Sequence, residues 1–163
     1  MKFLYLIRHA KSSLDFDWDN DFERTLDKRG KQEAALMAEK LFNKKVVINT
    51  IVSSTAIRAL TTAHFFATAY GINENAIIKI PELYHASANT LYYLIKKFDD
   101  ALNHVAVFSH NPGLTEFVNN LTDKIIPGMS TCDVFALVIH TTEWKNFEQA
   151  EKDFLFYDYP NNA

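Results

Sequence analysis

An apolar run at the start of the chain most constrains the fold. Residues 2–8 are almost continuously apolar and end abruptly at Arg8 and His9. A run of this kind is typical of a strand that is covered by helices on both faces. Further strands are predicted at 49–53, 77–80, 105–109, 134–139 and 153–157, and helical spacing of apolar residues predicts helices over 29–42, from about 55 to 70, over 88–98 and from 112 onward.

Alternating strands and helices indicate the α/β class. We expect a three-layer α/β/α arrangement, with a mostly parallel central sheet of about six strands and helices on both of its faces. The last two strands follow each other without a clear helix, so at least one of them is expected to be antiparallel. A length of 163 residues without repeats or linkers predicts one domain over residues 1–163.

Composition excludes several classes of partner. The net charge of −3 gives no basic field that could hold a nucleic acid backbone. No stretch approaches the roughly 20 apolar residues that span a bilayer, and the short run at the N-terminus does not resemble a signal peptide. We therefore expect a cytoplasmic protein without nucleic acid or membrane partners. A single cysteine, Cys132, excludes an internal disulfide and a metal site built from several cysteines.

Four polar side chains occur at the ends of predicted strands. Arg8 and His9 follow the first strand, and Arg58 lies in the first turn of the helix after the second. His110 directly follows the fourth strand. Ligands of open α/β sheets bind at the carboxyl ends of the strands, so these four residues are expected to converge at one edge.

Two guanidinium groups and two imidazoles suit the chemistry of phosphate. Arginine presents a planar fork that matches phosphoryl oxygens, and a neutral imidazole held in one tautomer is a nucleophile. Phosphoryl transfer depends mainly on positioning and electrostatics. A metal site is the alternative for two histidines, but the arginine charges and the lack of acidic residues at the strand ends weaken it. The cluster predicts phosphoryl transfer through a phosphohistidine on the protein itself, without a metal or other cofactor.

Several motifs occur in an order that resembles the histidine phosphatase superfamily, and more narrowly its SixA-type phosphohistidine phosphatase branch. Ala10 stands where the superfamily usually has glycine, a change typical of this branch. The matching pieces span most of the chain: Leu6-Ile7-Arg8-His9-Ala10-Lys11-Ser12-Ser13, Asp21-Phe22-Glu23-Arg24-Thr25-Leu26 with Arg29-Gly30, Ser53-Ser54-Thr55-Ala56-Ile57-Arg58-Ala59 with Thr62-Ala63, Leu83-Tyr84-His85-Ala86, and Ser109-His110-Asn111-Pro112-Gly113-Leu114.

The resemblance implies a phosphoglycerate mutase-like fold and a role for each matching residue. His9 would be the phosphorylated nucleophile, Arg8 and Arg58 would bind the phosphoryl oxygens, and His110 would complete the pocket. Further residues are expected to contact phosphate or substrate: Ser12, Asn111 and Arg24. For Arg24, an ion pair with Asp21 is the favoured alternative.

The proton donor is where the sequence departs from the pattern of the superfamily. Many of its phosphatases place a carboxylate just after the third strand, where this chain has His85. Glu82 lies near that position but slightly out of register. An alkoxide leaving group requires a general acid. A phosphorylated imidazole can instead take a proton from solvent and leave neutral, so a weak acid favours a phosphorus–nitrogen substrate.

Three functions remain open from the sequence. The favoured one is a metal-independent phosphatase of phosphohistidine in a partner protein, as in phosphorelay control. The second is a phosphomonoesterase of small phosphate esters or sugar phosphates on the same scaffold. The third is a phosphate-dependent binding module without turnover. Residues 11–28 are predicted to form a long loop over the end of the sheet, a length that suggests a working role, with a packed surface loop as the alternative.

Overall fold

Six strands and four α-helices make up the fold of the computed structural model, which describes residues 1–14 and 18–163, with the backbone alone at Trp18 and Asp19. The strands are β1 (Lys2–Arg8), β2 (Thr50–Ser53), β3 (Ile78–Lys79), β4 (His104–Ser109), β5 (Val134–Ile139) and β6 (Lys152–Asp158). The helices are α1 (Lys28–Asn43), α2 (Ile57–Tyr70), α3 (Ala88–Ile95) and α4 (Gly113–Asn119). No helix in the described ranges is long and apolar enough to cross a membrane.

The strands form one sheet in the order β3-β2-β4-β1-β5-β6. β4 is parallel to both β1 and β2, and β2 is parallel to β3. β5 is antiparallel to both β1 and β6, so the expected antiparallel strand near the C-terminus is present. The carboxyl ends of β1, β2 and β4 consequently lie at one edge of the sheet, together with the start of β5.

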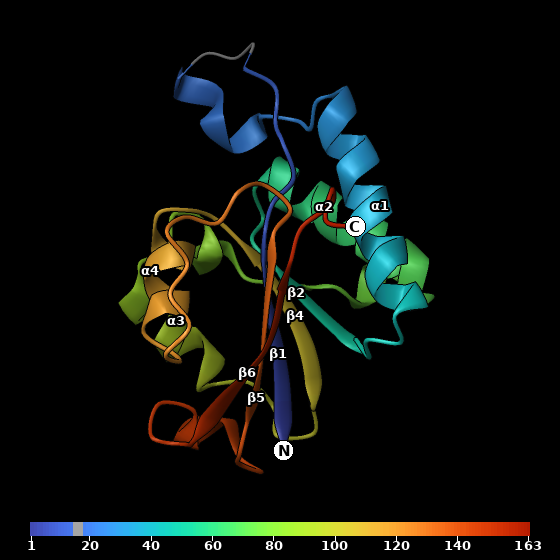
Figure 1. Ribbon diagram of the computed structural model, residues 1–163. Coiled ribbons are helices and arrows are strands. Elements are labelled where there is room, and N and C mark those ends of the chain that lie inside the picture. The colour runs from blue at the N-terminus through green and yellow to red at the C-terminus, as the bar shows by residue number, and fades with distance from the viewer. Residues whose placement is uncertain (15–17) are drawn as a thin grey trace.

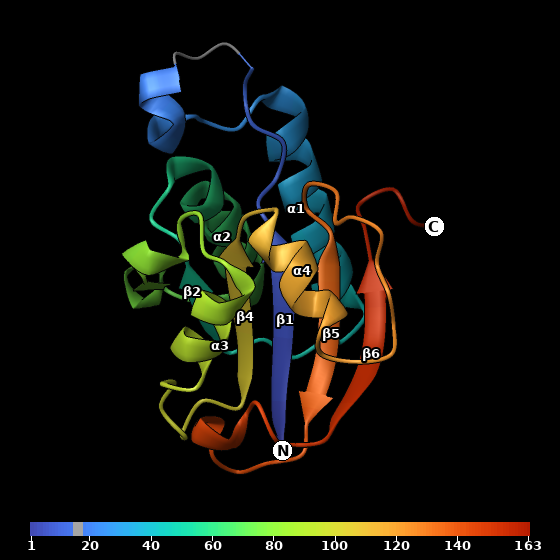
Figure 2. The same cartoon turned by 90° about the vertical axis from the view of Figure 1, so that its left-hand side faces the viewer.

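Helices cover both faces of this sheet. α1 and α2 lie on one face and α3 and α4 on the other, as the two views in Figures 1 and 2 show. Alternate side chains of β1 therefore enter different cores: Leu4 and Leu6 pack in the cluster of α3 and α4, and Tyr5 and Ile7 in the cluster of α1 and α2. Burial of each such side chain contributes roughly 1.5–3 kcal/mol. The predicted α/β/α architecture is confirmed.

Some element boundaries differ from the prediction. β3 contains only Ile78 and Lys79, both exposed, because it lies at the edge of the sheet. Helix α2 begins slightly later than the predicted start near residue 55: Ala56 occupies the cap position, and no side chain caps the helix. Gly71 ends the helix in the left-handed conformation.

The long loop over the sheet edge contains a short 3₁₀ segment, η1 (Trp18–Glu23), which lies above the carboxyl ends of the strands in Figure 1. Residues 15–17 of the predicted loop lie outside the described residues. The two stems of the loop meet at a bridge between Ser12 and Leu26. The loop is therefore anchored close to the residues that follow β1.

The end of this loop is joined to α1 by close packing. Asp27 caps the helix by accepting a hydrogen bond of 2.7 Å from the Gly30 amide, and its carboxylate also pairs with Lys11 at 2.7 Å. A Cβ at Gly30 would lie 2.0 Å from the Lys11 carbonyl oxygen, so only glycine fits. The Arg29-Gly30 motif thus holds α1 against the turn after β1.

Candidate active site

The structure brings together the four residues that the sequence placed at strand ends. Arg8 is the last residue of β1, His9 follows it, Arg58 lies in the first turn of α2, and His110 follows β4. All four line one cavity of about 320 Å³. Its other lining residues are Lys11, Ser12, Leu14, Asp21, Arg24, His85, Asn111 and Thr131.

His9 is held in one tautomer. Its ring is buried, and Nδ1 lies 2.8 Å from the carbonyl oxygen of Ala10, which can only accept a hydrogen bond. Burial lowers the pKa of His9 to about 3, so the ring is neutral at physiological pH. Its proton is therefore on Nδ1, and Nε2 carries a free lone pair. The Ala10 amide donates to Thr62 Oγ1 at 2.9 Å, which ties this turn to α2.

His110 lies beside His9, with 5.1 Å between the ring centroids. Its Nε2 is 2.8 Å from the hydroxyl of Ser54, and burial lowers its pKa to about 2. Ser54 Oγ already accepts a hydrogen bond from the Ala56 amide, and its own proton is free to be donated to Nε2. When that proton is donated to Nε2, the neutral ring carries its own proton on Nδ1, which is buried without a hydrogen-bond partner.

A terminal nitrogen of Arg8 and one of Arg58 each donate a hydrogen bond to a backbone carbonyl oxygen, which fixes the two side chains. Arg8 Nη1 donates to the Met129 carbonyl at 2.9 Å, and Arg58 Nη1 donates to the Asp21 carbonyl at 2.7 Å. Arg58 Nη2 also pairs with the carboxylate of Asp21 at 3.1 Å. The Nε atoms of Arg8 and Arg58 are buried and have no partner.

The unpartnered nitrogens are compatible with an anion site. Among the described residues, four buried side-chain nitrogen or oxygen atoms lack a hydrogen-bond partner, and three of them belong to Arg8, Arg58 and His110. Buried polar groups in proteins are almost always hydrogen-bonded, so a cluster of exceptions needs an explanation. Three N–H donors around one cavity are complementary to the oxygens of a phosphoryl group.

Asp21 supplies the counter-charge at the rim of the cavity. Its carboxylate contacts Arg58, pairs with Arg24 Nε at 3.1 Å, accepts a hydrogen bond of 2.6 Å from the Tyr84 hydroxyl, and lies 3.6 Å from His85 Nε2. Burial alone would raise the pKa of Asp21, but the Tyr84 hydroxyl and the two arginines hold it below its usual value. Asp21 is therefore an anion at neutral pH.

The other residues that the sequence placed in the site divide into two groups. Ser12 and Asn111 both line the cavity, and Asn111 Nδ2 shares the Met129 carbonyl with Arg8, at 2.9 Å. Arg24 lines the cavity and also pairs with Asp21, so both interpretations of this residue are compatible with its position.

The two candidate proton donors differ in position. His85 lines the cavity, with 60% of its side chain exposed and a positive φ of 56°. Glu82 is exposed and is not among the residues that line the cavity. Within the described part of the chain, no three His, Cys, Asp or Glu side chains are grouped as a metal site would require.

Sequence reasoning missed the function of Ser54 and Tyr84 around the site. The contact of Ser54 with His110 crosses 56 positions of the chain. Tyr84 donates a hydrogen bond from its hydroxyl to Asp21, 63 positions away in the chain. Both residues lie inside motifs of the resemblance, which was the one available signal.

Comparison with known proteins gives a family and a fold. A sequence model described as the histidine phosphatase superfamily (branch 1) matches residues 4–88. An uncharacterised chloroplast protein of Arabidopsis thaliana is 29% identical over 150 residues, covering 87% of this chain and 68% of its own. An uncharacterised protein of Mycobacterium leprae is 32% identical over 119 residues, covering 71% of each chain.

Solved structures share the architecture over almost the whole chain. The protein histidine phosphatase SixA complexed with tungstate is 22% identical, with a TM-score of 0.80 and 97% of each chain covered. A protein of Agrobacterium tumefaciens assigned as phosphohistidine phosphatase SixA is 24% identical, with the same TM-score and 98% and 99% covered. These neighbours confirm the phosphoglycerate mutase-like fold. Because the family model covers more than half of the 163 residues, the chain belongs to the histidine phosphatase superfamily, branch 1.

Proposed function

We propose that the protein is a phosphatase that removes the phosphoryl group from phosphohistidine in a partner protein, through a phosphohistidine intermediate at His9. One observation carries this proposal. The unprotonated Nε2 of His9 belongs to a cavity in which Arg8, Arg58 and His110 each hold a buried nitrogen without a partner. The arrangement combines a nucleophile with three donors for the oxygens of the group that it attacks.

In the first step the lone pair of His9 Nε2 attacks phosphorus. The bond between phosphorus and the substrate imidazole nitrogen breaks, and its electron pair stays on that nitrogen. The departing imidazole takes a proton from water and leaves neutral. The N–H groups of Arg8, Arg58 and His110 bind the three equatorial oxygens, where the charge of the transition state is spread.

In the second step water attacks the phosphorus of the phosphorylated His9. The phosphorus–Nε2 bond breaks, its electron pair returns to Nε2, and the water proton goes to solvent. The hydrogen bond from Nδ1 to the Ala10 carbonyl keeps the ring in the same orientation during both steps. The enzyme thereby returns to its starting tautomer with inorganic phosphate as product.

The acid–base groups of the cavity favour a phosphorus–nitrogen bond as the target. Asp21 is the one carboxylate among the described residues that line the cavity, and its partners keep it ionised. An anionic carboxylate cannot protonate an alkoxide leaving group. The imidazole that leaves a phosphohistidine can take its proton from water instead. The structural likeness to a protein histidine phosphatase also supports this choice.

A second candidate function rests on the position of His85. Its ring lines the cavity and lies 3.6 Å from Asp21, so a protonated His85 could donate a proton to the leaving oxygen of a small phosphate ester. A structural neighbour at 16% identity and a TM-score of 0.68 is a mycobacterial glucosyl-3-phosphoglycerate phosphatase. Hydrolysis of alkyl phosphates would then depend on His85.

Phosphate release from matched substrates tests the proposal. With EDTA present, we expect faster hydrolysis of a chemically phosphorylated histidine peptide than of glycerol phosphate, and little change in the variant His85→Gln. His140→Gln, whose ring pairs with Asp153 on β6, is the matched control. Preferential hydrolysis of glycerol phosphate that is lost in His85→Gln would support the esterase instead. Peptide binding without any phosphate release would indicate a binding module.

A further inference from the structure

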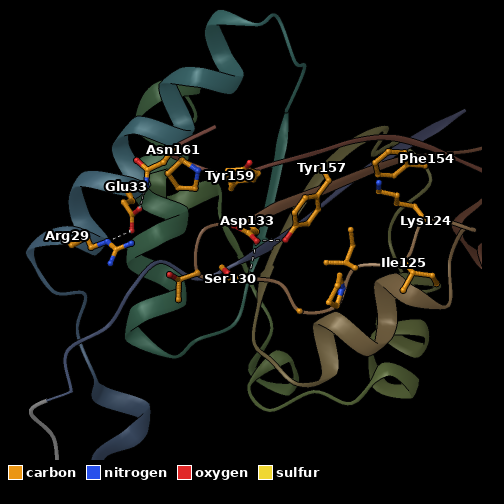
Figure 3. A pocket seen from close by; sticks show the side chains of 15 residues that line it. Arg29, Glu33, Lys124, Ile125, Ser130, Asp133, Phe154, Tyr157, Tyr159 and Asn161 are labelled. Carbon is orange, nitrogen blue, oxygen red and sulfur yellow. Dashed lines mark hydrogen bonds and ion pairs between the residues drawn. The ribbon is translucent and has the colours of Figure 1, made fainter. Parts of the chain in front are cut away.

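A second and larger hollow lies at the same edge of the sheet, beside the cavity of about 320 Å³ around His9. We call the cavity around His9 the catalytic cavity. The larger hollow has a volume of about 690 Å³ and is built from β6, the loop before β5, the start of α1 and the C-terminal residues 159–161 (Figure 3). We call it the side groove. Its lining residues are Arg29, Glu33, Lys124, Ile125, Ile126, Pro127, Gly128, Ser130, Thr131, Asp133, Phe154, Tyr157, Tyr159, Pro160 and Asn161.

The side groove and the catalytic cavity share a wall. Thr131 lines both. The chain on either side of Thr131 is fixed by Arg8, whose Nη1 donates to the Met129 carbonyl and whose amide donates to the Asp133 carbonyl at 3.2 Å. A group bound in the catalytic cavity therefore has the side groove as its immediate neighbour.

The carboxylates of the side groove are satisfied within the protein. Asp133 accepts hydrogen bonds from the Tyr157 hydroxyl and from the Ser130 amide. Glu33 pairs with Arg29 at 3.2 Å and accepts a hydrogen bond of 3.3 Å from Asn161 (Figure 3). Both carboxylates are therefore engaged by partners within the protein.

Lys124, unlike these two carboxylates, has a charge that is not paired within the groove. No ion pair involves its ammonium among the described residues, and that group lies 5.6 Å from the Phe154 ring. Apolar surface in the same groove is exposed: Ile125, next to Lys124 in the chain, is 63% exposed, and Tyr159, which lies beside Asn161 in Figure 3, is 43% exposed. The side groove thus offers a cation and solvated apolar surface, which complement an acidic side chain and an apolar one.

We propose that the side groove holds the polypeptide next to the phosphohistidine of the substrate protein, with an acidic side chain opposite Lys124 and an apolar side chain against Ile125. This inference rests on the proposed function. When the imidazole of the substrate occupies the catalytic cavity, its main chain must continue outside. An extended chain advances about 3.3 Å per residue, so a few residues suffice to enter a neighbouring hollow.

Two peptides that differ only in charge test the inference. Both are fluorescein-labelled, contain one histidine beside a leucine, and carry either three glutamates or three lysines on one flank. Binding of the unphosphorylated peptides is measured by fluorescence anisotropy. Phosphate release is measured after each histidine has been phosphorylated with phosphoramidate. Free phosphohistidine serves as the small substrate.

For the native protein we expect about tenfold tighter binding and about tenfold higher kcat/KM with the glutamate peptide. Lys124→Glu should reverse this preference and leave kcat/KM for free phosphohistidine within about twofold. Ile125→Asp should weaken both peptides. Lys31→Glu, at an exposed position of α1 outside both hollows, is the matched control and should keep the native preference.

Different results would overturn the two proposals. An unchanged charge preference in Lys124→Glu contradicts docking in the side groove, whether or not phosphate is released. A change of oligomeric state in Lys124→Glu or Ile125→Asp, seen by light scattering without a change of preference, would assign the groove to a second copy of the chain. Reversed peptide binding without phosphate release from any substrate would retain the groove and contradict the proposed function.

Discussion

Asp21 holds Arg58 at two points: its backbone carbonyl accepts a hydrogen bond of 2.7 Å from Nη1, and its carboxylate lies 3.1 Å from Nη2. The two residues are 37 positions apart in the chain. The contact leaves the Nε atom of Arg58 as the unpartnered nitrogen. A residue of the long loop over the sheet edge thereby orients a guanidinium of the candidate active site.

Asp21→Ala should weaken catalysis through Arg58. A hydrogen bond to a charged group contributes about 1.5–3 kcal/mol, which corresponds to a loss of about ten- to a hundredfold in kcat/KM. Asp21→Asn, which keeps an acceptor, should lose less. Steady-state kinetics with free phosphohistidine measures both, and Glu23→Gln, in the same 3₁₀ segment but exposed, is the control. Native kcat/KM in Asp21→Ala would show that Arg58 needs no positioning.

Ser54→Ala should disturb the tautomer of His110. Without the hydroxyl, Nε2 loses its partner, and the proton is no longer directed to Nδ1. We expect kcat to fall about tenfold with a smaller change in KM, since one donor to the transition state is weakened. The ¹⁵N chemical shifts of His110 should report the mixed tautomer.

The neighbouring serine provides the control for that variant. Ser53 is equally buried, but its hydroxyl donates to the Ser54 carbonyl and not to an imidazole. Ser53→Ala should therefore keep the native kcat and the native ¹⁵N shifts. Equal effects of the two substitutions would mean that Ser54 acts on folding alone.

The two buried imidazoles make stability depend on pH. In the folded state the pKa of His9 is about 3 and that of His110 about 2, whereas an unfolded histidine titrates near 6.5. Below pH 6.5 the unfolded state therefore binds protons that the folded state does not. The free energy of unfolding should fall as the pH drops from 7 to 5, by roughly 1–2 kcal/mol for each of the two groups.

Urea unfolding at the two pH values measures this dependence. The double variant His9→Gln/His110→Gln should show a clearly smaller difference between pH 7 and pH 5 than the native protein. His64→Gln, at a partly exposed position of α2, is the control and should keep the native difference. A double variant with the full native difference would mean that other groups cause it.

Gly113 should not tolerate a side chain. A Cβ at this position would lie 1.8 Å from the Ala86 carbonyl oxygen, so the backbone would have to move. Overpacking of this kind costs typically 1–3 kcal/mol, and we expect Gly113→Ala to reach the upper end. Gly128→Ala, where nothing lies within 4 Å of the added atom, should stay within about 0.5 kcal/mol of the native protein in urea unfolding. Similar stabilities of the two variants would contradict the close packing at Gly113.

The layers of the fold could be predicted because their signals are local. The alternation of Leu4 and Leu6 with Tyr5 and Ile7 on a covered strand is visible in the sequence as one apolar run. β3 was predicted as longer than it is, because Ile77 and Ile80 continue the apolar pattern, whereas only Ile78 and Lys79 pair with β2.

The site could be predicted only in part. Arg8, His9, Arg58 and His110 follow from their places at the ends of parallel strands. The contact of Asp21 with Arg58 has no local signal in the sequence. Asp21 lies in a long loop that has no periodic pattern, so its place beside α2 could not be predicted. The left-handed backbone of His85 and the exposed position of Glu82 are likewise set by the turn after β3 and not by residue type.

Trapping the phosphorylated enzyme tests the central claim most directly. The protein is mixed with a histidine peptide carrying ³²P-phosphohistidine, quenched in alkali within milliseconds, and mapped by mass spectrometry. We predict an acid-labile, alkali-stable phosphoryl group on His9, and neither label nor turnover in His9→Ala. A fully active His9→Ala variant, or a label on any other residue, would contradict the account.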